Sequence, residues 1–202
     1  MVNLTPDNQE SIFWAWFEQN HAKLDLENDV EGSVNLIWQQ IQNVHDELAV
    51  ELGHQSGEHG NWELIISADG MEQLFPYVSN LIESAPVIQG WTFTGFRPRC
   101  GSDTCINYQG HKYSNETVFF EAYDGGGKLD LKIFIRDFDK LDESEAGYAT
   151  FILLDSIIGE YDTVTKIGHI ERLRLPDVPE KNRYPIGELP DILDDYVANL
   201  NN

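Results

Sequence analysis

The chain has 202 residues, with 13 Lys and Arg against 35 Asp and Glu, so its formal net charge is −22 at pH 7. A hydrophobic share of 41% excludes disorder throughout and supplies enough apolar side chains for a sizeable core. A field this negative repels nucleic acid and anionic membrane surfaces and attracts basic proteins. We therefore expect neither nucleic acid nor a membrane as a partner. The simpler alternative is that the charge serves solubility alone.

The negative charge is concentrated in the first half of the sequence. No Lys or Arg occurs between Lys23 and Arg97, whereas residues 24–96 hold twelve Asp or Glu. No apolar run approaches the roughly 18 residues that a membrane span needs. The opening MVNLTPDNQES lacks the basic and apolar regions of a secretory signal. The expected compartment is therefore the cytoplasm.

Residues 1–46 are expected to form a helical segment. Thr5-Pro6-Asp7 is a helix-start signal, with Pro in the first turn. An apolar stripe with helical spacing follows it, and it consists of Ile12, Phe13, Trp16 and Phe17. An acidic linker at 25–32 separates this first helix from a second one at 33–45.

Residues 47–97 read as strand, strand, helix, strand. Alternation predicts strands at 48–52 and 62–67. An amphipathic helix is expected over 71–82, and the last strand begins after Gly90. The regular spacing in this stretch strongly supports these strands and this helix, but it does not indicate a catalytic or binding site.

Residues 116–175 repeat this order of elements. Two strands, 117–123 and 128–136, flank a glycine-rich hairpin turn at 124–127. A helix follows at 142–161, capped by Asp142 or Ser144, and a strand at 167–174. A short acidic helix at 187–200 ends the chain. The insert at 100–115 is expected to be irregular.

These elements predict one α+β domain over residues 1–202. The halves 47–97 and 116–175 would form a pseudo-repeat, because both read strand, strand, helix, strand. Their strands would join in a single six-stranded, mostly antiparallel sheet with the helices on one face. The helical segment 1–46 would lie nearby.

The sequence shows no catalytic motif, metal site or cofactor-binding motif. It has no nucleophile elbow, HExxH, Walker loop or dinucleotide fingerprint, so no catalytic residue is predicted and enzymatic activity is left undecided. Cys100 and Cys105 form a C-x4-C pair, which with His111 would supply part of a zinc site. Because a second Cys pair is missing, two free thiols are the default and no metal is predicted.

Four arginines form the one basic grouping. Arg97 and Arg99 are expected to end one strand with same-face spacing, and Arg172 and Arg174 to end the equivalent strand of the other half. If they converge, they could hold an anionic ligand. The alternative is that each neutralises a nearby carboxylate.

Four tryptophans are candidate anchors for a protein partner, because exposed Trp is enriched at binding hot spots. They are Trp14, Trp16, Trp38 and Trp62. For the aromatic-rich first helix, burial against a sheet is the competing interpretation.

Three segments together resemble a group of uncharacterised bacterial proteins. The segments are FWAWF at 13–17, ELIISADG at 63–70 and GFRPR at 95–99. The resemblance extends over about half of the chain. It implies a bacterial, cytosolic α+β protein and brings no catalytic residues with it.

The leading hypothesis is a non-enzymatic, acidic interaction module that binds a basic protein, with an immunity or antitoxin-like role as one form. The alternative is a small-molecule binder or enzyme that uses the four arginines around an anionic group. A third alternative is a homodimer joined through a sheet edge.

Overall fold

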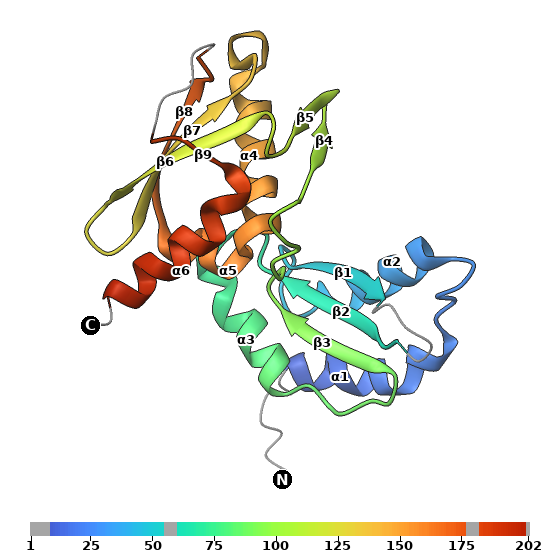
Figure 1. Cartoon of the computed structure of the whole chain (residues 1–202). Coiled ribbons are helices and arrows are strands. Elements are labelled where there is room, and N and C mark those ends of the chain that lie inside the picture. Colours follow the sequence, from blue (N-terminus) through green and yellow to red (C-terminus); the bar gives the residue numbers. More distant parts are fainter. Residues whose placement is uncertain (1–8, 55–59, 177–181, 201–202) are drawn as a thin grey trace. The chain divides into compact units, whose positions relative to one another are not determined.

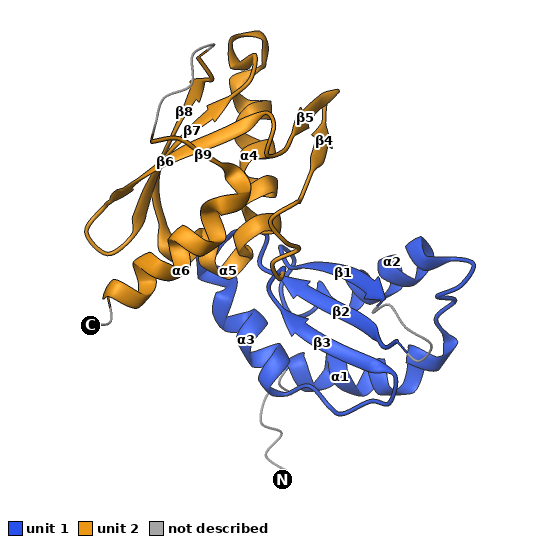
Figure 2. Ribbon diagram, viewed as in Figure 1, with its two compact units in different colours: residues 1–97 blue, residues 98–202 orange. Residues whose placement is uncertain are grey.

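A computed structural model describes residues 9–54, 60–176 and 182–200 of the chain (Figure 1). The expected helix start at Thr5-Pro6-Asp7 lies outside these ranges. The chain divides into two compact units, residues 1–97 and 98–202 (Figure 2). Within the described ranges, no helix combines the length and apolar character that crossing a bilayer requires.

The first unit combines a three-stranded sheet with three α-helices. Its elements are α1 (Gln9–Asn20), η1 (His21–Lys23), α2 (Val30–Ile41), β1 (Ala49–His54), β2 (Trp62–Ser67), η2 (Glu72–Leu74), α3 (Phe75–Glu83) and β3 (Trp91–Gly95). The strand order is β1-β2-β3, with β1 antiparallel and β3 parallel to β2.

Aromatic side chains of α1 build much of the first core. Trp14 and Phe17 are buried, and their rings lie 4.6 and 5.4 Å from the ring of Phe93 on β3. The Trp14 indole N–H donates to the carbonyl of Leu81 on α3 at 2.8 Å. Since a buried indole N–H needs an acceptor, this bond lets Trp14 be fully enclosed.

The second unit contains a four-stranded sheet, a small hairpin and three α-helices. Its elements are β4 (Ile106–Tyr108), β5 (His111–Tyr113), β6 (Val118–Asp124), β7 (Leu129–Ile135), η3 (Phe138–Lys140), α4 (Glu143–Ile158), α5 (Glu160–Lys166), β8 (Ile167–Arg174), β9 (Tyr184–Pro185), η4 (Ile186–Glu188) and α6 (Leu189–Leu200). The four-stranded sheet has the order β8-β7-β6-β9, and β4 pairs with β5 alone.

One face of the four-stranded sheet carries the second core. Alternate residues of β7, among them Leu131 and Ile133, pack with Leu153 and Ile157 of α4 and Leu193 of α6. Asp142 caps α4 by accepting hydrogen bonds from the backbone N–H groups of residues 144 and 145. The predicted cap of α4 is therefore present, and α4 and α6 both contribute to the core of this sheet.

The two units have the same local topology. In each, an antiparallel hairpin (β1–β2, β6–β7) is followed by helix and then by a strand that pairs in parallel with the second hairpin strand (β3 with β2, β8 with β7). Each sheet is therefore formed largely by one contiguous stretch of chain.

The prediction of a single six-stranded sheet is wrong. The strands form separate sheets of three, two and four strands, because each hairpin pairs with its own parallel strand and not with the other half. The insert expected to be irregular contains the β4–β5 hairpin, whose turn places Gln109 and Gly110 at positive φ. The helix expected over 142–161 is interrupted at Gly159, where φ is 84°, so α4 ends and α5 begins.

The second helix begins earlier than expected. Val30, and not Ser33, opens α2, because the carboxylate of Asp29 accepts a hydrogen bond from the Gly32 N–H at 2.9 Å and caps the helix. Part of the expected acidic linker is therefore helical.

Candidate interaction surface

Arg97 belongs to the first unit and is held by two carboxylates. It forms ion pairs with Glu51 on β1 and with Asp69 after β2, the latter at 3.0 Å. Burial acts to lower the pKa of Arg97, but the hydrogen bonds to both carboxylates outweigh it, so the pKa is raised. The guanidinium thus links β1 to the turn after β2 within its own unit.

Arg99 belongs to the second unit, where it connects three helices. Its guanidinium donates to both carboxylate oxygens of Asp194 on α6, at 3.0 and 2.8 Å, and to Asp162 on α5 at 2.8 Å. Its Nε donates to the Ile158 carbonyl at the end of α4 at 3.0 Å. These four bonds engage all three guanidinium nitrogens, and four of the roughly five N–H donors that an anionic ligand could use.

Arg172 and Arg174 both lie on β8 but in different surroundings. The Arg174 guanidinium is 3.3 Å from Asp139 of η3 and is exposed. Arg172 is half-buried, and its guanidinium lies beside Gly147 of α4, where a Cβ would be 3.6 Å away. The arginines are thus divided between two units, and three of the four are paired with carboxylates. This arrangement favours charge neutralisation over a shared anion site.

The tryptophans differ widely in exposure. Trp14 is 3% exposed and belongs to the core, and Trp16 and Trp62 are half-buried. Trp38, on α2, is 44% exposed. Trp38 is therefore the one of these four that offers most of its ring to a partner.

Exposed carboxylates precede Trp38 along the chain. Four exposed acidic residues lie between the end of η1 and the first turn of α2: Asp25, Glu27, Asp29 and Glu31. Glu31 and Trp38 are two helical turns apart, so they share one side of α2. Residues 25–38, including these carboxylates and Trp38, are named the acidic α2 segment below.

The local backbone orders this acidic segment. The Asp25 carboxylate accepts hydrogen bonds from the backbone and side-chain nitrogens of Asn28, both at 3.0 Å, and these bonds lower its pKa. Asp29 is fixed as the cap of α2. Two of the four carboxylates are therefore held in place before any partner arrives, which lowers the entropy lost on binding.

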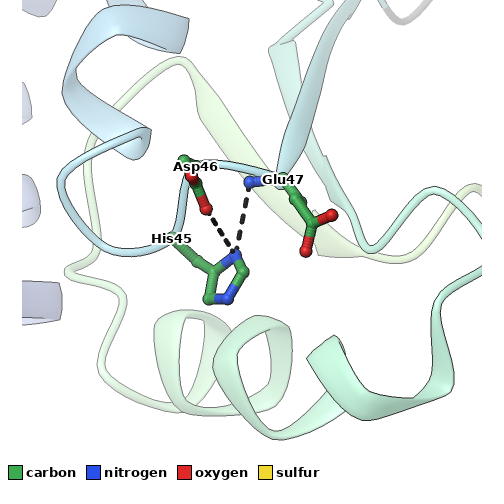
Figure 3. A group of neighbouring side chains, drawn as sticks. All are labelled: His45, Asp46 and Glu47. Atoms are coloured by element: carbon green, nitrogen blue, oxygen red, sulfur yellow. Dashed lines mark hydrogen bonds and ion pairs between the residues drawn. The ribbon is translucent and has the colours of Figure 1, made fainter.

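A second acidic group follows α2, at the turn before β1 (Figure 3). The His45 Nδ1 accepts a hydrogen bond from the Glu47 N–H at 3.3 Å and lies 3.5 Å from an Asp46 oxygen. The His45 ring also contacts Tyr77, with ring centroids 4.9 Å apart. One ligand atom from each of His45, Asp46 and Glu47 lies within 4.8 Å of the others. Because Nδ1 already has a backbone donor, the turn is explained by local hydrogen bonding.

The two cysteines are not joined by a disulfide bond. Cys100 and Cys105 are exposed free thiols. Among the described residues, the His/Cys/Asp/Glu grouping with metal-ligand spacing is the turn at 45–47, and neither cysteine belongs to it.

Comparisons with known proteins add no family to this description. No protein-family model matches the chain, and no curated protein matches it significantly.

Proposed function

We propose that this chain is a non-enzymatic, acidic interaction module that binds a basic protein through the acidic α2 segment. The observation that carries the proposal is Trp38, an exposed indole on the same side of α2 as Glu31, with three further exposed carboxylates, Asp25, Glu27 and Asp29, before the helix in the sequence. Exposed Trp side chains are enriched at binding hot spots, and nearby charge steers a partner of the opposite sign. A cytoplasmic immunity or antitoxin-like role is one form that such a module takes.

The charge distribution supports a basic partner. Residues 24–96 contain no Lys or Arg, and Arg97, the first cation after them, is already paired with Glu51 and Asp69. The exposed carboxylates of the acidic α2 segment therefore lie in a stretch without Lys or Arg of its own, which begins just after Lys23. Such a field accelerates encounter with a positively charged surface.

The alternative, an anion-binding protein built on Arg97, Arg99, Arg172 and Arg174, has weaker support. Arg97 and Arg99 have their donors engaged by carboxylates of their own units, and Arg174 is beside Asp139. An anion would have to displace these partners before it could bind.

Capture from the native host at low salt, followed by a salt gradient and mass spectrometry, tests the proposal. We expect one basic protein to elute stoichiometrically, because binding that depends on charge weakens as salt rises. Immobilised Trp38→Ala and Glu27→Gln/Glu31→Gln variants should each retain much less of it.

Matched controls come from the second unit. Tyr148→Ala removes an aromatic ring that is 57% exposed on α4, and Glu143→Gln/Glu188→Gln removes two exposed charges. These controls should capture the partner like the wild type. Equal losses in both sets, or capture indifferent to salt, would refute the acidic α2 segment as the binding surface.

A further inference from the structure

The loop before β4 carries the two cysteines of the chain. Cys100 and Cys105 are both exposed free thiols, with residues 101–104 between them. Neither belongs to the hydrophobic core of the second unit. Buried structural cysteines are inert, whereas exposed thiols are open to oxidants. The pair is therefore placed for chemistry and not for packing.

A hydrogen-bonded turn separates the two cysteines. The N–H and the Oγ1 of Thr104 both donate to the Gly101 carbonyl, at 3.2 and 2.6 Å. Such a turn reverses the chain and holds its end Cα atoms within about 7 Å of each other. A disulfide usually joins Cα atoms about 4–7 Å apart. Because Cys100 and Cys105 are the residues immediately before and after the turn, it brings them toward the separation that a disulfide spans.

The rest of the second unit holds this loop at two points. The Cys100 N–H donates to the Ser156 carbonyl at 2.7 Å, and the Ser102 carbonyl accepts from the Asn115 side-chain amide at 2.9 Å. Gly187 lies against the same part of the loop, because a Cβ on it would collide with the Ser102 oxygen. A loop that is already ordered loses less entropy when its ends are joined.

We propose that Cys100 and Cys105 form a redox-active dithiol, which peroxides oxidise to an intramolecular disulfide. In the first step one sulfur attacks hydrogen peroxide, and a sulfenic acid and water are formed. In the second step the other thiol attacks the sulfenic sulfur, so that an S–S bond forms and the sulfenic oxygen leaves as water. In total the two thiols lose two hydrogens, and one peroxide is reduced to two molecules of water. Thiol–disulfide exchange with a reducing thiol reverses the reaction.

The short separation favours a disulfide within one chain over a link between two chains. Groups joined by a short tether meet at an effective concentration on the order of millimolar, well above the micromolar concentration of separate chains in an assay. The formal charge of −22 on each chain also keeps two copies apart at low salt. The second thiol of the same chain should therefore reach a sulfenic acid first.

The dithiol and the proposed binding surface are separate features of the molecule. The cysteines belong to the second unit, and the acidic α2 segment belongs to the first. The two can therefore fail independently, since a chain whose thiols do not join can still capture a basic protein.

Oxidation of the reduced full chain with one equivalent of hydrogen peroxide tests the proposal. We expect mass spectrometry to show a product that is lighter by two hydrogens and no longer reacts with N-ethylmaleimide. It should remain a monomer on a non-reducing gel, and dithiothreitol should restore both thiols. Cys100→Ser and Cys105→Ser each lack the second thiol, so they should accumulate sulfenic acid, which dimedone traps, or cross-linked dimers. A wild type that gives mainly these same products would overturn the proposal.

The contribution of the turn can be measured separately. Thr104→Val removes the Oγ1 hydrogen bond to Gly101 and keeps the shape of the side chain. Its disulfide should be about threefold to tenfold less stable in equilibrium with glutathione, as expected for one lost hydrogen bond. Thr165→Val removes an equivalent bond, from Oγ1 to the Tyr161 carbonyl at 2.7 Å, and is the control. Thermal melts confirm that both variants fold, and equal glutathione equilibria in the two would refute the role of the turn.

Discussion

The guanidinium of Arg99 and the carboxylate of Asp194 form a bidentate pair, with N···O distances of 3.0 and 2.8 Å. Arg99 is near the beginning of the second unit and Asp194 is in its last helix, so the pair fixes the first residues of the unit to α6. Asp162 and the Ile158 carbonyl complete the set of acceptors. Arg99 therefore acts in this structure as a clamp between helices.

Removal of this clamp should destabilise the second unit. Arg99→Ala loses bonds to two carboxylates and a helix-terminal carbonyl, and we expect a loss of about 1–2 kcal/mol after allowance for solvent screening at a partly exposed site. Urea denaturation of wild type and variant measures this loss of unfolding free energy. Lys112→Ala removes an exposed ion pair with Glu116 and is the control, with an expected change below about 0.5 kcal/mol. Equal effects of the two substitutions would contradict the clamp.

The same pair predicts a dependence of stability on pH. The hydrogen bonds from Arg99 lower the pKa of Asp194 in the folded protein below its value in the unfolded chain, about 3.9 for Asp. Its stabilisation is therefore present above about pH 4 and is lost as pH falls through the folded-state pKa. The difference in unfolding free energy between wild type and Asp194→Asn should be constant from about pH 5 to 7 and shrink below about pH 4. A difference that grows in acid would refute this assignment.

Two glycines should respond to alanine with opposite signs. A Cβ at Gly95 of β3 would lie 2.9 Å from the Ile82 Cγ1 and 3.2 Å from the Val78 Cγ1, so Gly95→Ala should cost about 1–3 kcal/mol. A Cβ at Gly147 of α4 would meet the Arg172 guanidinium at an ordinary 3.6 Å. Because Ala favours helix over Gly, Gly147→Ala should stabilise by up to about 1 kcal/mol. Thermal melts of both variants compare the two directly.

Substitution of one tryptophan should affect the stability of the fold, and substitution of another should affect binding alone. Trp14→Ala opens a cavity in the first core and leaves the Leu81 carbonyl without its indole donor, at an expected cost of about 3–5 kcal/mol. Trp38→Ala removes an exposed ring and should change the unfolding free energy by less than about 1 kcal/mol. Denaturant unfolding of both variants, beside the capture assay, checks this. A large loss of stability in Trp38→Ala would mean that its ring serves the fold.

Local patterns predicted most of the elements but not the sheets. The strand over 167–174 has the expected bounds, because alternation and flanking residues define it locally. Which strands pair is decided by packing over long distances, and identical orders of elements in two halves leave one sheet and two sheets equally consistent with the pattern. β9 contributes two residues to its sheet, too few to produce a periodic signal. The β4–β5 hairpin could have been predicted from Gln109-Gly110 between two short alternating runs.

The surroundings of the candidate site residues were likewise only partly predictable from the sequence. The same-face spacing of Arg97 and Arg99 assumed that β3 continues to them, but β3 ends at Gly95 and Phe96 has a φ of 64°. The Phe96 ring instead packs on Phe75, with centroids 4.5 Å apart. The spacing of apolar residues along α2 did not by itself predict that Trp38 would be exposed. In the structure Ile37 and Ile41 fill the buried side of the helix, and Trp38 is left facing solvent.

The shared hairpin–helix–strand topology bears on how the protein is made. All partners in the first sheet are present once Gly95 has been synthesised, so this unit can complete its fold on the ribosome while the remainder is still being translated. The second unit must wait for β9 and for Asp194, which come near the end of the chain. We therefore expect the first unit to fold before the second during synthesis, so that a stall near the end of the chain would leave a folded first unit attached to an incomplete second one.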